Sequence, residues 1–237
     1  MGLLIEAAIA KTAKYASGES GDSAELIERP GGGLSVVLID GQGSGQAARS
    51  LSLLLSAHAV GLIKEGVRDG AVARAVHDRL FAFRHGQVSA TLDIVSVDLR
   101  TKTLVVARNA ETPLLIGRSG AFDVAPCAGE PIGLYLRSRP AIWEVPLEAG
   151  LQAAVCTDGV SGAGLRHGLG DFDLVAFVGE TLDPNRTAAE LADALLIEAI
   201  RRDAGRPADD MTVVVAAVRS HEDGLPVRRQ AASVPLP

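Results

Sequence analysis

The chain has very few cysteines and no pattern that would use them for cross-links or for metal binding. Only Cys127 and Cys156 occur in 237 residues, far apart, without a Cys-x-x-Cys motif and without a histidine close by. This spacing argues against a disulfide framework and gives no support to a structural zinc site. We therefore expect two ordinary buried thiols in a reducing cytoplasm.

Long basic runs and long apolar runs are also missing. The formal net charge is -6 and no run of Lys and Arg exceeds two residues, so a nucleic-acid-binding face is not expected. The most apolar stretch, residues 51–63, is too short to span a bilayer, and residues 1–6 lack the features of an export signal or a lipid anchor. The expected protein is cytoplasmic, with no nucleic-acid or membrane partner, and its oligomeric state stays open.

The periodicity of the apolar residues predicts a mixture of helices and strands. Helical spacing covers residues 44–65 and 69–84, and a third helix follows the capping box of Thr187 and Glu190 and ends near Gly205. Alternating or β-branched runs predict strands at residues 4–10, 24–29, 34–39, 88–99, 103–108, 113–116, 141–147, 151–157 and 212–218. The strands between residues 88 and 157 are expected to form a meandering antiparallel sheet.

The order of these elements fits neither alternating β-α-β units nor an all-β protein. It favours sheets that helices cover on their outer faces. The length and the polar composition after Arg219 predict one domain, residues 1–219, and a loose tail, residues 220–237. The glycine-rich segment 161–170 is expected to be a plain connection, with a mobile flap as the alternative.

Four aspartates stand at the rims of predicted strands or beside turn signals: Asp22, Asp40, Asp158 and Asp209. A carboxylate at the end of a buried strand is costly unless a cation neutralises it, so this set predicts a metal site. Oxygen ligands alone favour Mg²⁺ or Mn²⁺ over zinc or copper. Two such ions can activate a water for in-line attack on a phosphoester, so the predicted chemistry is phosphate hydrolysis.

The glycine-rich turn 40–45 lies between a strand and a helix, where a nucleotide-binding loop would also lie. Asp40 places a negative charge in that turn, the third glycine of the dinucleotide fingerprint is absent, and no lysine follows as in a P-loop. We therefore interpret the glycines as making room for a cation, with the carbonyl of Gly41 as a further ligand.

Seven short motifs, taken in order, resemble the metal-dependent protein serine/threonine phosphatases of type 2C, the PPM family, and their bacterial SpoIIE-like branch. The motifs are Gly21-Asp22-Ser23, Asp40-Gly-Gln-Gly-Ser-Gly45, Ser89-Ala-Thr-Leu92, Asn109-Ala110, Gly129-Glu-Pro-Ile-Gly133, Thr157-Asp158-Gly159 and Asp209-Asp210-Met211-Thr212. Each motif alone is a weak signal, whereas the ordered set is specific. The layout is most similar to the stand-alone RsbX-type phosphatases.

This resemblance implies a four-layer α-β-β-α sandwich of two mainly antiparallel sheets, with two Mn²⁺ or Mg²⁺ ions at one edge. Carried over by residue, Asp40 would bridge both ions and the Gly41 carbonyl would bind one of them. Asp158 and Asp209 would bind the other ion, and Asp22 would act chiefly through bound water. The implied substrate is phosphoserine or phosphothreonine on a bacterial signalling protein, of the anti-sigma-factor antagonist or stress-signalling scaffold type.

Two departures from the family's pattern keep other functions open. Gln42 stands where many eukaryotic relatives have a histidine proposed as general acid, and Glu111-Thr112 replaces the Gly-His of the bacterial branch. Glutamine cannot donate a proton at neutral pH, so no general acid is assigned. The alternatives are a catalytically degenerate binding module with the same fold and a hydrolase of small phosphate esters.

Overall fold

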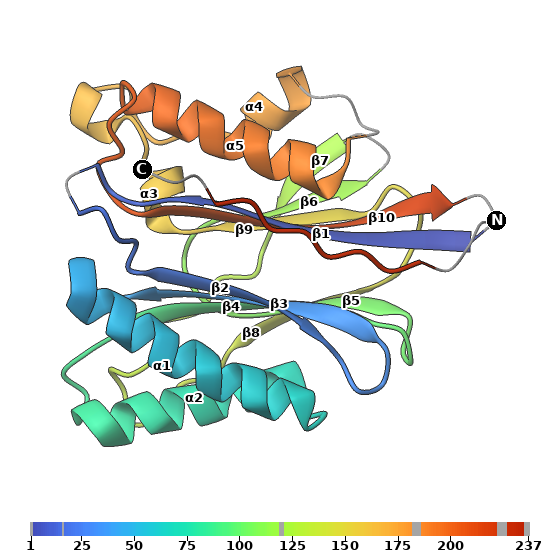
Figure 1. Ribbon diagram of the computed structural model, residues 1–237, viewed down its shortest axis with the longest axis horizontal. Coiled ribbons are helices and arrows are strands. Elements are labelled where there is room, and N and C mark those ends of the chain that lie inside the picture. The colour runs from blue at the N-terminus through green and yellow to red at the C-terminus, as the bar shows by residue number, and fades with distance from the viewer. Residues whose placement is uncertain (1, 16, 119–120, 182–185, 222–226, 235–237) are drawn as a thin grey trace.

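Two five-stranded antiparallel sheets lie face to face, and helices cover the outer face of each (Figure 1). The computed structural model describes residues 2–15, 17–118, 121–181, 186–221 and 227–234. The layers follow the order helix, sheet, sheet, helix. The predicted fold class, an α+β protein built as a four-layer α-β-β-α sandwich, is therefore confirmed.

The first sheet, which we call the β3 sheet, has the strand order β2-β3-β4-β5-β8. Its strands are β2 (Asp22–Glu28), β3 (Gly33–Gly41), β4 (Ala90–Asp98), β5 (Thr103–Asn109) and β8 (Ala141–Pro146). Two long helices cover its outer face, α1 (Gly45–Lys64) and α2 (Asp69–Arg84). Both helices lie where the apolar periodicity predicts them.

The second sheet, which we call the β10 sheet, has the strand order β1-β10-β9-β6-β7. Its strands are β1 (Gly2–Thr12), β6 (Leu114–Arg118), β7 (Ala121–Ala125), β9 (Gln152–Cys156) and β10 (Met211–His221). Its helices are α3 (Asp158–Ser161), α4 (Leu174–Thr181) and α5 (Ala188–Arg202), with a 3₁₀ turn at Leu165–His167. The predicted capping box of α5 is present, because the Thr187 hydroxyl accepts from the Glu190 amide and the Glu190 carboxylate accepts from the Thr187 amide.

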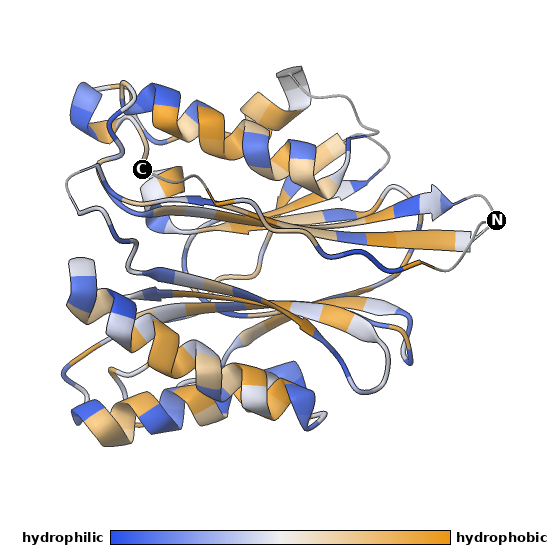
Figure 2. Cartoon of the chain, in the orientation of Figure 1, coloured by the Kyte–Doolittle hydropathy of each residue, from blue (hydrophilic) through white to orange (hydrophobic). Residues whose placement is uncertain are grey.

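Strand alternation explains why the sheets are covered on both faces. In β4, Leu92 and Ile94 belong to the apolar core under α1 and α2, whereas Val95 and Val97 belong to the core between the sheets. Successive side chains of a strand point to opposite faces, so one apolar run supplies both cores. Figure 2 shows apolar residues in the strands of both sheets and on the inner sides of the helices.

Three features differ from the sequence-based expectations. The strands between residues 88 and 157 do not form one meander, because β6 and β9 pair with each other in the β10 sheet while β4, β5 and β8 stay in the β3 sheet. The edge strand β7 was not expected, since most of its residues are exposed and its apolar signal is weak. Helix α4 was also missed, because its short Leu-Val-Ala-Phe-Val run resembles a strand as much as a helix.

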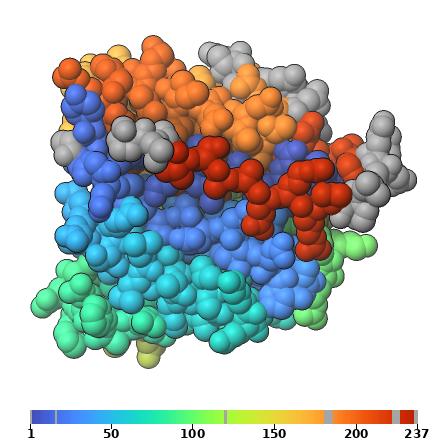
Figure 3. All heavy atoms as spheres, viewed as in Figure 1, coloured from blue at the N-terminus to red at the C-terminus, as the bar shows by residue number. Residues whose placement is uncertain are grey.

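The C-terminal part of the chain leaves the sandwich after β10. That strand continues to His221, three residues beyond the predicted end, and residues 227–234 have no regular secondary structure and are exposed. Figure 3 shows this segment lying over one face of the molecule, where Arg228 Nη1 is 3.9 Å from a carboxylate oxygen of Glu28. The predicted boundary between residues 1–219 and 220–237 stays a prediction.

No helix within the described ranges is both long enough and apolar enough to cross a membrane.

Candidate metal centre

A pocket of about 290 Å³ opens at the edge of the sandwich where both sheets end close to α1 and α3. Five aspartates line it: Asp22, Asp40, Asp158, Asp209 and Asp210. The backbone of Gly41 also lines it, and none of the described lining residues is Lys, Arg or His. The structure thus brings all five of the predicted site residues to one place, although they are up to 187 positions apart in the sequence, from Asp22 to Asp209.

The register of the strands explains this convergence. Asp22, the first residue of β2, pairs directly with Asp40 near the end of β3. In the other sheet, Val213 of β10 pairs with Cys156 of β9, which places Asp158 and Asp209 just beyond neighbouring strand ends. Because the two sheets are stacked, these strand ends meet at the same edge (Figure 1, left).

Two glycines let the elements around the pocket approach closely. A Cβ atom on Gly41 would lie 2.7 Å from the Ala48 carbonyl oxygen in α1, and one on Gly159 would lie 2.1 Å from the Asp210 carbonyl oxygen. Any larger residue would push apart the helix, the strand and the turn that carry the aspartates. The Asp-Gly pairs of the sequence are therefore needed for packing as well as for the turns.

Asp22 connects the two sheets at the floor of the pocket. Its Oδ2 atom accepts hydrogen bonds from the hydroxyls of Thr157, at 3.1 Å, and of Thr212, at 2.5 Å, both from the opposite sheet. Burial raises the pKa of Asp22 to about 6, although the two hydroxyls oppose that shift. The Oδ1 atom accepts no hydrogen bond within the described structure, so one oxygen stays available for a cation or its water.

Asp40 is the most electrostatically strained carboxylate of the set. Burial, followed by repulsion from Asp22, Asp158, Asp209 and Asp210, raises its pKa to about 8. Burial and the nearby Asp209 likewise raise the pKa of Asp158. Without a bound cation, Asp40 therefore favours its protonated form at neutral pH, where a carboxyl in water is ionised.

Asp210 is a pocket residue that the sequence analysis did not single out. Its two oxygens accept backbone hydrogen bonds from Lys14, at 2.8 Å, and from Gly21, at 2.7 Å. It thereby fixes the segment before β2, and with it Asp22. Its neighbour Asp209 is more exposed and has Lys14 Nζ at 3.9 Å. The only sequence signal was the doubled aspartate, which on its own favours a charged pair that blunts a strand edge.

Gln42 does not act as an acid but holds two loops together. Its Oε1 atom accepts hydrogen bonds from the backbone amide of Ser89, at 2.8 Å, and from the Ser89 hydroxyl, at 3.3 Å. Since the carbonyl oxygen is occupied, the two N–H donors of the amide are available to the pocket, which both residues line. The loop that carries Asp40 is thus tied to the start of β4.

The donor set fits hard divalent cations. It consists of carboxylate and carbonyl oxygens only, with an excess of negative charge that nothing lining the pocket compensates. Within the described ranges, no three or more Asp, Glu, His or Cys residues are arranged so that they could hold an ion by themselves. Mg²⁺ usually keeps several waters and takes only one or two carboxylates, so spaced carboxylates around a pocket of this size fit hydrated ions rather than a closed protein cage.

The fold places the chain in a known structural class. The PP2C phosphatase domain of the cell fate determinant SpoIIE from Bacillus subtilis superposes with a TM-score of 0.80, at 23% identity, over 93% of this chain and 65% of that one. RsbX, solved in complex with magnesium, superposes with a TM-score of 0.68, at 15% identity, over 90% of this chain and 95% of that one. The architecture is therefore that of the PP2C phosphatases.

The family can be stated more closely from sequence. The family model described as Stage II sporulation protein E (SpoIIE) matches residues 30–219, and this chain belongs to the SpoIIE family. Stage II sporulation protein E of Priestia megaterium is 25% identical over 225 residues, which are 91% of this chain and 37% of that protein. The chain thus spans little more than a third of the length of that relative. The predicted resemblance to the PPM family and its SpoIIE-like branch is confirmed.

Proposed function

We propose that this chain is a metal-dependent phosphoprotein phosphatase that hydrolyses phosphoserine or phosphothreonine on a bacterial signalling protein. The observation that carries this proposal is the pocket lined by five aspartates and by no described basic side chain. Such a site repels a phosphate group unless cations neutralise it, since two unit charges 4 Å apart interact by about 4 kcal/mol at an effective dielectric near 20. The SpoIIE family and the PP2C fold support the same activity.

The pocket residues would have two roles, which are binding of the metal ions and positioning of water. Asp40 would hold both Mn²⁺ or Mg²⁺ ions, the Gly41 carbonyl would bind one of them, and Asp158 and Asp209 would bind the other. All four residues line the pocket. Asp22 is held by two hydroxyls and would position water through its remaining oxygen. When bound, the ions would neutralise the phosphate charge and lower the pKa of a water towards 7.

The choice of a protein substrate rests on family membership and on the position of the pocket among the strand ends at the edge of the sandwich. A phosphorylated anti-sigma-factor antagonist or stress-signalling scaffold is the substrate type we propose. The two cysteines, Cys127 and Cys156, are buried and unpaired, which is compatible with action in a reducing cytoplasm.

The test compares two substrates under two metal conditions. Phosphate release from a phosphoserine peptide and from p-nitrophenyl phosphate is measured with Mn²⁺ or with chelator, for the wild type, Asp40→Asn and the exposed control Asp78→Asn. We expect metal-dependent release, a loss of about a hundredfold or more in Asp40→Asn, because its bridging charge is removed, and a change within about twofold in Asp78→Asn.

Each alternative has its own outcome. Activity that survives both chelator and Asp40→Asn contradicts the proposed mechanism. A kcat/KM for p-nitrophenyl phosphate equal to or above that for every phosphopeptide supports a small-ester hydrolase. Metal binding without turnover of any phosphorylated substrate supports a degenerate binding module.

A further inference from the structure

The loop before β8 carries an apolar surface that the pocket chemistry leaves unexplained. Leu134, Tyr135 and Leu136 are consecutive and 38%, 54% and 75% exposed, and we call these three residues the loop ridge. They are the longest run of exposed large apolar side chains in the described chain. Isolated exposed apolar residues need no explanation, but a contiguous group on one loop marks an interaction surface.

The loop ridge is held at its base and free at its tip. Ile132 and Ala90 exchange two backbone hydrogen bonds, and the Gly133 amide donates to Nδ1 of the buried His77. Asn109 Nδ2 donates to the Glu130 carbonyl and to the Ser138 hydroxyl, each at 2.9 Å. The chain is therefore fixed on both sides of the ridge. A partner that covers the ridge does not have to order this loop first, which lowers the cost of binding.

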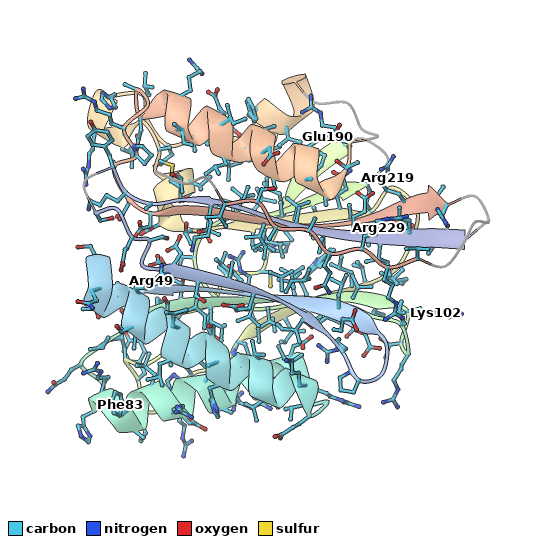
Figure 4. All side chains as sticks on the ribbon, viewed as in Figure 1. Arg49, Phe83, Lys102, Glu190, Arg219 and Arg229 are labelled. Atoms are coloured by element: carbon cyan, nitrogen blue, oxygen red, sulfur yellow. The ribbon has the colours of Figure 1, made fainter. Side chains whose placement is uncertain are left out.

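The loop ridge is also close to the pocket along the chain. Pro131 lines the pocket, and Leu134 follows three residues later, so their Cα atoms are at most about 11 Å apart. An extended peptide rises by about 3.3 Å per residue, so three or four residues beyond a phosphoserine in the pocket would reach the ridge. The end of α2 lies beside this loop, because a Cβ atom on Gly86, two residues after α2, would lie 3.2 Å from the Leu134 carbonyl oxygen. Phe83, in the last turn of α2, is itself exposed (Figure 4).

Two arginines indicate the charge of the partner. Arg137 and Arg139 are exposed on the same loop, directly after the ridge, and no described Asp or Glu forms an ion pair with either. Unpaired arginines beside apolar side chains suit a segment that carries both apolar and acidic residues. The same arrangement does not suit a second copy of this ridge, because the arginines of two copies would repel.

We propose that the loop ridge, together with Arg137 and Arg139, binds the substrate segment next to the phosphorylated residue, and that this segment is apolar and acidic. This proposal rests on the proposed phosphatase function. A protein substrate would contact the ridge, whereas a small phosphate ester would not. The phosphorylated residue would react in the pocket, and binding of the flanking segment to the ridge would make the enzyme select between phosphoproteins.

The experiment uses two synthetic phosphoserine peptides of equal length, one flanked by Leu and Glu and the other by Gly and Ser. For each enzyme variant, kcat/KM on both peptides is compared with kcat/KM on p-nitrophenyl phosphate, which is too small to reach the ridge. We expect the wild type to prefer the Leu/Glu peptide by about tenfold or more. The preference should fall to within twofold in Tyr135→Gln/Leu136→Gln, and should fall in part in Arg137→Glu. Ile197→Gln is the matched control, since Ile197 is 64% exposed on α5, and it should keep the preference.

Three results would overturn the proposal. One is a wild type that turns over both peptides equally. Another is a ridge variant that keeps the full preference. The third is a ridge variant that only lowers self-association in sedimentation, because the ridge would then be an interface between copies. If the wild type hydrolyses nothing, the phosphatase proposal fails separately. The ridge is then judged by fluorescence anisotropy, where equal affinity of the labelled Leu/Glu peptide for wild type and ridge variant contradicts it.

Discussion

Carboxylates occur in two places between the sheets, and the two places differ in whether a basic side chain neutralises the negative charge. Inside the sandwich, Asp93 of β4 accepts hydrogen bonds from Nε, at 2.8 Å, and Nη2, at 3.3 Å, of Arg108 in β5, and both residues are buried. At the edge, the five aspartates of the pocket have no basic side chain among the described lining residues. The inner pair is neutral by itself, whereas the edge cluster needs charge from outside. We expect this difference between a carboxylate that stabilises the fold and carboxylates that bind a cation.

The inner pair should give the largest loss of stability when it is broken on one side. Arg108→Met leaves the Asp93 carboxylate buried without its partner, and we expect the free energy of unfolding to fall by about 3–5 kcal/mol. The double variant Asp93→Leu/Arg108→Met removes both charges and should recover most of this loss. Urea unfolding monitored by circular dichroism measures both variants. A double variant as unstable as the single one would show that Arg108 matters through packing rather than through charge.

The edge cluster should show the opposite response, since it is stabilised by neutralisation from outside. The pKa of Asp40 is raised to about 8 and that of Asp22 to about 6, in both cases by burial first and then by neighbouring carboxylates. Between the ordinary pKa near 4 and these values the folded state binds more protons than the unfolded state. The free energy of unfolding must therefore fall as pH rises through this window.

In chelator we expect a loss of about 2–3 kcal/mol between pH 5 and pH 8. One pKa unit corresponds to about 1.4 kcal/mol, and the coupled carboxylates share their protons, so the separate shifts do not add. Mn²⁺ or Mg²⁺ should remove this slope, because the ions take the place of the protons. Asp40→Asn should reduce it in chelator, while Asp78→Asn should keep it. Thermal unfolding across pH measures the slope for wild type with chelator and with metal, and for each variant in chelator. An equal slope in wild type and Asp40→Asn would contradict the assignment of the pH dependence to Asp40.

These contrasts also show what the sequence could and could not predict. Helices α1, α2 and α5 follow from apolar spacing and capping, which are local signals. Asp40 and Asp158 could be found because each ends a buried run beside a glycine. The division of the strands between two sheets could not, because it depends on pairing between distant segments such as β1 and β10. The role of the four aspartates as metal ligands stays a prediction.

Asp210 shows most clearly what the sequence cannot predict, because a second aspartate, outside the pocket, has the same pattern of hydrogen bonds. Asp203 after α5 also accepts two backbone hydrogen bonds, from Gly164 at 2.8 Å and Ala208 at 2.6 Å, and is as well buried. In sequence both aspartates resemble turn residues. Asp210 lines the pocket and Asp203 does not. Asp210 therefore also repels Asp40 and Asp22 and raises the pKa of both.

The smallest predicted effect separates these two aspartates. Both Asp210→Asn and Asp203→Asn replace one of two accepting oxygens by a donor, so each should cost about 1–3 kcal/mol of unfolding free energy. In chelator at pH 8 we expect Asp210→Asn to lose about 1 kcal/mol less than Asp203→Asn, because it also relieves repulsion among the carboxylates. In Mn²⁺ this advantage should vanish, since bound ions already neutralise the cluster. Urea unfolding with chelator and with Mn²⁺ gives the comparison, and a difference that does not depend on the metal would show that Asp210 acts only as a backbone clamp.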